Sequence, residues 1–202
     1  TGGSVISIGA APWQVRIRTG GRGLCGGALI GAQQVVTAAH CTYDGDHPLA
    51  PAALSVISGS SAFNPESAAL APVLRAGDDP VISQVAAIRR HPGFTPTADG
   101  TTSLAQGRDD VAVLTLAEPV VLDGIVRQAI ALPERNTVLR IGTRLSVTGF
   151  GLIDEHPQRL DGRLRRLTDM TLLDPAANSG IWNADYLAVS SQTGLDCSGD
   201  SG

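Results

Sequence analysis

Short apolar or alternating stretches recur along the whole chain, separated by glycine, proline and aspartate. The segment 13–18 (Trp-Gln-Val-Arg-Ile-Arg) alternates apolar and polar residues with a period of two, which is typical of a half-buried strand. The segment 111–116 is an apolar run with the length of a strand. Further strands are predicted at 24–30, 34–37, 54–57, 81–88, 144–148 and 164–173. No long helical periodicity competes, so the pattern predicts an all-β barrel or sandwich.

The composition agrees with a loop-rich β protein and argues against two classes of binding partner, nucleic acids and membranes. The 202 residues are 43% hydrophobic and 17% charged, with 24 glycines and 12 prolines. A net charge of −4 argues against a broad basic surface for nucleic acid or an anionic membrane. No apolar run reaches the roughly 20 residues of a membrane helix, and Thr1-Gly-Gly lacks a signal-peptide pattern. We therefore expect a processed protein that binds neither nucleic acid nor membranes.

The three cysteines are Cys25, Cys41 and Cys197. A disulfide that closes the short loop between Cys25 and Cys41 would stabilise the fold by about 3 kcal/mol in the chain-entropy model. Two buried free thiols are the alternative, because that state is common in cytosolic proteins. Cys197 has no partner left, and we expect its partner in residues that follow Gly202.

Three polar elements, each weak alone, occur together in an order that indicates nucleophilic catalysis. Val36-Thr-Ala-Ala-His40-Cys41 runs from a strand end into a histidine, and Asp109-Asp110 precedes the apolar run. The chain ends in Cys197-Ser-Gly-Asp-Ser201-Gly202. A serine hydroxyl needs a neighbouring imidazole to take its proton, and the imidazole needs a carboxylate that fixes its tautomer. Glycines beside the serine let backbone N–H groups converge on a developing oxyanion.

With these motifs the sequence resembles the trypsin-like serine endopeptidases of the chymotrypsin fold, over almost its whole length. Val36-Thr-Ala-Ala-His-Cys matches the histidine motif of that family, and Gly199-Asp-Ser-Gly matches the nucleophile motif. Asp110-Val-Ala-Val-Leu is similar to the family's Asp-Ile-Ala-Leu-Leu. The other similar segments are Ala11-Pro-Trp-Gln-Val, Leu24-Cys-Gly-Gly-Ala-Leu-Ile, His91-Pro-Gly-Phe and Val147-Thr-Gly-Phe-Gly.

The resemblance implies a role for each residue of the triad. His40 would be the general base, Asp110 the carboxylate that orients it, and Ser201 the nucleophile. The backbone N–H groups of Gly199 and Ser201 would form the oxyanion hole. Asp109 is the rival for the carboxylate, but Asp110 directly precedes the Val-Ala pair, as in the family.

The resemblance also implies an all-β fold of two antiparallel β-barrels. Residues 1–128 would hold the N-terminal segment and the first barrel, and residues 129–202 the second barrel without its C-terminal part. His40 and Asp110 would come from the first barrel and Ser201 from the second, so that catalysis would take place in the cleft between them.

Two features of the nucleophile segment set this sequence apart from the family: the amino terminus that would pair with Asp200, and the residue at the position of the specificity aspartate. In the family, a new amino terminus at Ile-Val-Gly-Gly pairs with the aspartate that corresponds to Asp200, whereas this sequence begins Thr1-Gly-Gly. An unpaired Asp200 would be costly to bury and would favour a zymogen-like loop.

Leu195 occupies the position of the specificity aspartate of trypsin, and the carboxylate follows at Asp196. Cleavage after a basic residue and cleavage after an apolar residue both remain open.

We therefore expect a serine endopeptidase that hydrolyses peptide bonds through an acyl-enzyme. Its partners would be protein or peptide substrates and protein inhibitors, and it would need no cofactor. No metal is expected, because the spacing of Glu66, Asp78 and Asp79 does not reproduce a calcium site. All 15 basic residues are arginine, which with the many alanines indicates a GC-rich bacterial genome. The resemblance implies a secreted or periplasmic protein. The alternatives are an inert zymogen-like fragment or homologue that serves as a protein-binding module, and an esterase.

Overall fold

The computed structural model describes residues 3–19, 23–66, 71–96, 109–155, 158–174 and 189–190. Within these residues the chain forms short strands and three 3-10 turns, η1 (Ile8–Ala10), η2 (His40–Thr42) and η3 (Pro51–Ala53). The predicted all-β class is confirmed. No helix in the described part of the chain is long and apolar enough to cross a membrane.

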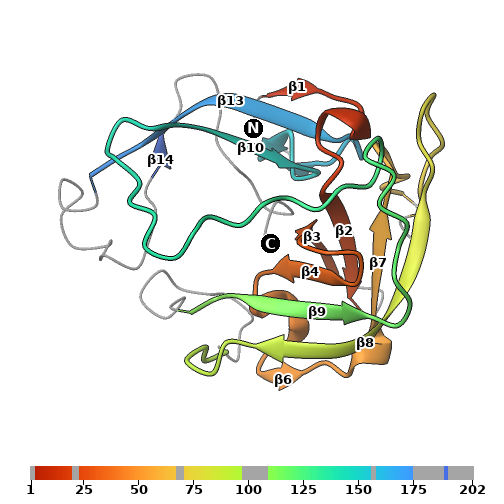
Figure 1. The fold of residues 1–202 in the computed structure, drawn as a ribbon. Helices are drawn as coiled ribbons and strands as arrows, with labels where there is room; N and C mark the ends of the chain where they lie inside the picture. The colour runs from red at the N-terminus through yellow and green to blue at the C-terminus, as the bar shows by residue number, and fades with distance from the viewer. Residues whose placement is uncertain are drawn as a thin grey trace.

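Six strands close into an antiparallel barrel, which occupies the lower right of Figure 1. Each of these strands overlaps a segment that alternation or an apolar run predicts. Around the barrel the order is β2 (Gln14–Thr19), β3 (Gly23–Leu29), β4 (Gln34–Thr37), β9 (Ala112–Leu116), β8 (Val81–Arg90) and β7 (Leu54–Ser58). Strands β4 and β9 are far apart in sequence but adjacent in the barrel, and their pairing places residues 34–37 beside residues 112–115.

Aliphatic side chains fill the barrel. In β9, Ala112, Leu114 and Leu116 are buried, while the residues between them are partly exposed. Full burial of one such leucine contributes about 1.5–3 kcal/mol relative to leaving it in water. The buried residues of this core are Val15, Ile17, Cys25, Leu29, Val35, Ala38, Cys41, Leu54, Val56, Val85, Leu114, Leu116 and Val120.

Strand β2 departs from the simple alternation that its sequence predicts, because its first four residues are all buried. Alternate residues face the barrel core, whereas Gln14 and Arg16 lie on the opposite face. There the Arg16 guanidinium lies 4.2 Å from the ring centre of Phe63 and 5.4 Å from that of Phe150. The Gln14 side-chain oxygen accepts a hydrogen bond of 2.7 Å from the Thr148 hydroxyl. The face of β2 that points away from the barrel core is therefore also buried inside the protein.

A second antiparallel sheet lies in the upper part of Figure 1. It contains β1 (Ser4–Val5), β13 (Arg165–Leu172) and β10 (Arg144–Gly149), with β14 (Val189–Ser190) paired to β13. Two short ribbons are β5–β6 (Tyr43–Asp44 and His47–Pro48) and β11–β12 (Asp154–Glu155 and Gln158–Arg159). A second buried cluster contains Ile8, Ala11, Phe63, Val126, Phe150 and Leu164.

Candidate active site

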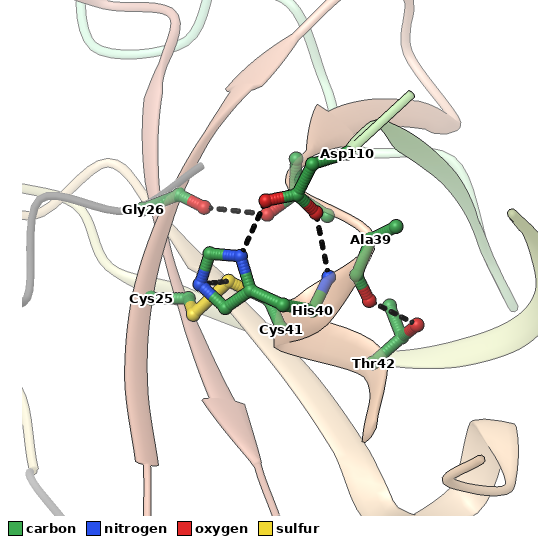
Figure 2. Close-up of a disulfide and its surroundings, with 8 residues drawn as sticks. Cys25, Gly26, Ala39, His40, Cys41, Thr42 and Asp110 are labelled. Carbon is green, nitrogen blue, oxygen red and sulfur yellow. Dashed lines mark hydrogen bonds and ion pairs between the residues drawn. A yellow bond between two sulfur atoms is a disulfide. The ribbon is translucent and has the colours of Figure 1, made fainter. Parts of the chain in front are cut away.

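The histidine of the predicted triad lies in η2, just after β4. The Thr42 backbone N–H and hydroxyl both donate to the Ala39 carbonyl, at 2.9 and 2.7 Å, and close this turn. Cys41 forms a disulfide with Cys25 of β3, so the predicted disulfide is present and the free-thiol alternative is wrong (Figure 2). The disulfide and the turn together attach His40 to the wall of the barrel.

Both oxygens of Asp110 bind His40 (Figure 2). The ring Nδ1 of His40 lies 2.7 Å from Oδ2 of Asp110, and the His40 backbone N–H donates to Oδ1 at 2.8 Å. An ionised carboxylate can only accept hydrogen bonds, so Nδ1 carries the proton in this pair. The neutral ring therefore has its lone pair on Nε2, which is the tautomer that a general base requires.

The environment of Asp110 favours its ionised form. Burial alone would raise the pKa of this carboxyl. Hydrogen bonds from the ring and backbone N–H of His40, the charge of His40 and a hydrogen bond from the Ala39 backbone outweigh burial and lower the pKa below its ordinary value. Asp110 is therefore an anion at neutral pH, able both to hold the His40 ring and to stabilise its protonated form.

The two neighbouring aspartates point to different histidines. Asp109 has a φ of 59°, in the left-handed region that aspartate tolerates better than most residues. Its carboxylate lies 3.5 Å from Nδ1 of His91, which directly follows β8. The structure thus pairs His40 with Asp110 and turns the rival Asp109 toward His91.

Among the described residues, the other ring nitrogen of His40, Nε2, has one neighbouring polar atom within hydrogen-bonding range, the Cys41 sulfur. Nε2 lies 3.6 Å from Sγ of Cys41, and a disulfide sulfur carries no proton to donate. The His40 side chain is 27% exposed. The predicted residues Ser201, Gly199, Asp200, Leu195, Asp196 and Cys197 lie outside the described residues.

Cys25, His40 and Cys41 are the one set of three metal-ligating side chains that the described residues bring within 4.8 Å of one another. The disulfide occupies both sulfurs, so this set does not offer three ligands to a metal. Two acidic residues of the loop after β7, Asp78 and Asp79, bind other groups of the protein. Asp78 accepts hydrogen bonds of 3.0 and 2.6 Å from Ser61, and Asp79 lies 2.5 Å from a guanidinium nitrogen of Arg127.

Sequence reasoning missed one contact of this site. Arg90, in β8, donates hydrogen bonds to the side chain and the carbonyl of Thr42, which follows the His40-Cys41 pair. No local motif signals it, since 48 residues separate the two. The contact between Arg90 and the buried Thr42 side chain can be recognised only when the arrangement of the strands is known.

The barrel and the carboxylate-bound histidine define a protein of the chymotrypsin fold. The solved structure of human heparin binding protein is similar over 100% of this chain and 78% of its own, with a TM-score of 0.75 and 24% sequence identity. At that identity the likeness establishes the fold. The model of the trypsin family matches residues 1–202, and the chain therefore belongs to the trypsin family.

Curated relatives agree with this assignment. Human serine protease 56 is 32% identical over 210 residues, a match that covers all of this chain and 30% of that protein. Human granzyme M is 30% identical over 210 residues, covering all of this chain and 70% of the relative. The chain thus spans about a third of the length of serine protease 56.

Proposed function

We propose that this protein is a serine endopeptidase that cleaves peptide bonds through an acyl-enzyme, with His40, Asp110 and Ser201 as its triad. The observation that carries the proposal is the double hydrogen bond between Asp110 and His40, in a chain of the trypsin family. This pair supplies an imidazole with a fixed tautomer and its lone pair on Nε2, which is the part of the chemistry that the described residues contain.

In the first half of the reaction, Nε2 of His40 takes the proton of the Ser201 hydroxyl while Oγ attacks the carbonyl carbon of the substrate. The backbone N–H groups of Gly199 and Ser201 stabilise the resulting oxyanion. The C–N bond then breaks as Nε2 gives its proton to the leaving amine, which leaves an ester on Ser201. Asp110 stabilises the His40 cation through both transfers.

In the second half, water attacks the ester and His40 again acts as base. The carbonyl C–Oγ bond breaks, the carboxylic acid leaves, and the proton returns to Oγ of Ser201. Two further groups tune this cycle in the proposal. Asp200 needs a cation to be buried in an active loop, and the pair Leu195 and Asp196 sets which side chain precedes the cleaved bond.

The proposal extends to the surroundings of the enzyme. Its substrates are proteins or peptides, protein inhibitors are candidate partners, and the protein is secreted or periplasmic in a bacterium. Membership of a family of serine proteases supports the substrate class. In the proposal, residues 1–128 form a first unit and residues 129–202 a second, and the scissile bond of the substrate binds between them.

The test is hydrolysis of a mixed peptide library by the purified protein and by Ser201→Ala and His40→Ala. We expect the wild type to cleave peptides and both variants to lose activity by about 10³-fold or more, with unchanged melting temperatures. A variant that keeps nearly full turnover, or a folded wild type that cleaves nothing, would contradict the proposal. The second outcome would favour an inert protein-binding homologue.

A further inference from the structure

We propose that Arg90 is a positioning residue for His40, acting through the η2 turn. The proposal rests on the proposed function for its kinetic consequence, because positioning matters only where His40 acts as a base. Arg90 is the last residue of β8 and is half-buried. Its side-chain hydrogen bonds go to Thr42 and Leu49, which flank that turn, so it would act on His40 through the turn.

The guanidinium of Arg90 is bound at several points. Nε donates to the Thr42 hydroxyl oxygen at 2.7 Å, and Nη2 donates to the carbonyls of Thr42 and Leu49 at 2.9 and 2.8 Å. The guanidinium carbon also lies 4.8 Å from the ring centre of Tyr43. Hydrogen bonds from a charged donor are stronger than neutral ones, and a planar fork bound at three points has little freedom left.

These bonds continue to the residue before His40. Thr42 is fully buried, and its hydroxyl accepts from Arg90 while donating to the Ala39 carbonyl at 2.7 Å. The chain Arg90–Thr42–Ala39 therefore connects to the backbone on both sides of His40. Such linked hydrogen bonds polarise and reinforce one another in a buried setting.

The backbone of Arg90 lies beside the segment that carries Asp110. Arg90 pairs with Ala112 in the β8–β9 ladder, and Ala112 pairs on its other side with Thr37 of β4. In sequence, Ala112 follows Asp110 by two positions and Thr37 precedes His40 by three. One residue thus contacts the His40 turn through its side chain and the start of β9 through its backbone.

An apolar cluster supports the same junction. Ala39, Phe94 and Ala112 are buried together, and Tyr43 packs against them. The rings of Tyr43 and Phe94 lie 5.6 Å apart, so the ring beneath the Arg90 guanidinium is itself held in place. The position of η2 relative to β9 is therefore set by packing on one side and by the Arg90 fork on the other.

The position of η2 relative to β9 determines the hydrogen-bond distances between His40 and Asp110. Both hydrogen bonds of the pair, at 2.7 and 2.8 Å, require η2 and the start of β9 to be in register. Without Arg90, the Thr42 hydroxyl and the Leu49 carbonyl lose a charged donor and the turn can shift outward. A displacement of about 1 Å at a catalytic group can lower turnover by about 100-fold.

The test compares Arg90→Ala with Arg89→Ala. Arg89 is the exposed neighbour on β8, and its removal is the matched control for the loss of one positive charge. We expect Arg90→Ala to lower kcat on a peptide substrate by about 10- to 100-fold while KM stays within about threefold, and Arg89→Ala to keep both constants. Unchanged kcat in a folded Arg90→Ala protein would overturn the proposal.

Proton NMR supplies a readout that needs no turnover. The Nδ1 proton of His40 is held by Asp110, and its downfield resonance reports that hydrogen bond directly. We expect this resonance to shift or broaden in Arg90→Ala and to keep its wild-type position in Arg89→Ala. The same resonance in all three proteins would overturn the proposal, even for a wild type that cleaves no peptide. Failure of the endopeptidase assignment is thereby distinguished from failure of the positioning role.

Two milder variants cover the case in which Arg90→Ala does not fold. Arg90→Lys keeps the charge but replaces the planar fork with a single ammonium group, so we expect kcat and the resonance to be intermediate. Thr42→Val keeps the shape of the buried side chain and removes the hydroxyl that connects Arg90 to Ala39. Wild-type values in both variants would contradict the account.

Discussion

Asp110→Asn changes the tautomer of His40 while leaving its position nearly intact. The asparagine oxygen can still accept from the His40 backbone N–H, as Oδ1 does now at 2.8 Å. The amide nitrogen would face Nδ1, at the place where Oδ2 lies 2.7 Å away today. Because that nitrogen only donates, Nδ1 would become the acceptor and the ring proton would move to Nε2. Nε2 could then no longer take the proton of Ser201.

The expected loss of kcat at neutral pH is about 10⁴-fold, the size associated with a wrong histidine tautomer in this kind of triad. This corresponds to about 5.5 kcal/mol of transition-state stabilisation. Initial rates on a peptide substrate at saturating concentration measure it, with circular dichroism to show that the fold is retained. The matched control is Asp109→Asn, since the Asp109 carboxylate faces His91 and asparagine also tolerates a φ of 59°.

The control should keep kcat within about threefold of wild type. Turnover above about a tenth of wild type in Asp110→Asn would refute the reasoning, because an asparagine amide that donates to Nδ1 keeps the ring proton on Nε2. A large loss in Asp109→Asn with a small loss in Asp110→Asn would show that the two aspartates have the opposite roles.

Three further predictions follow from the contacts and the pKa direction. Replacing Cys25 and Cys41 together by serine should lower the free energy of unfolding by about 3 kcal/mol, since the disulfide spans 16 residues, and a urea-unfolding difference below about 1 kcal/mol would contradict it. The folded-state pKa of Asp110 is lowered, so its contribution to stability is fully present above the unfolded value of about 3.9 and is lost as pH falls through the lower folded value. Acid unfolding curves should therefore be less pH-dependent below about pH 4 in Asp110→Asn, and equal slopes in both proteins would argue against it. Arg127→Met should cost about 1–3 kcal/mol of stability, because Arg127 is buried and binds the Asp79 backbone and carboxylate; thermal unfolding at two salt concentrations measures this, and no loss would contradict it.

The strands of the barrel could be predicted because their signal is local. Alternation at 13–18 and the apolar run at 111–116 each follow from which side of one strand faces the core. The His40 and Asp110 segments were likewise visible as short motifs at strand ends. The disulfide could be proposed from the spacing of Cys25 and Cys41, but only the fold distinguishes it from two free thiols.

What the sequence did not indicate depends on contacts between distant segments. Alternation predicted a polar outer face for β2, yet Arg16 is 1% exposed because Phe63 and Phe150 cover it. The hydrogen bonds from Arg90 to Thr42 join the end of β8 to η2, and neither residue belongs to a recognisable motif. The left-handed backbone of Asp109, which separates its carboxylate from that of Asp110, has no signature in the residue itself.

The most direct test of the central claim is the reaction of the purified protein with a fluorophosphonate, followed by peptide mapping. The account predicts one adduct, on Ser201, whose rate of formation falls by about 10³-fold or more in His40→Ala and in Asp110→Asn. An adduct on Ser201 at the same rate in all three proteins would contradict a role for the His40–Asp110 pair. A folded protein with no adduct at all would contradict the endopeptidase itself.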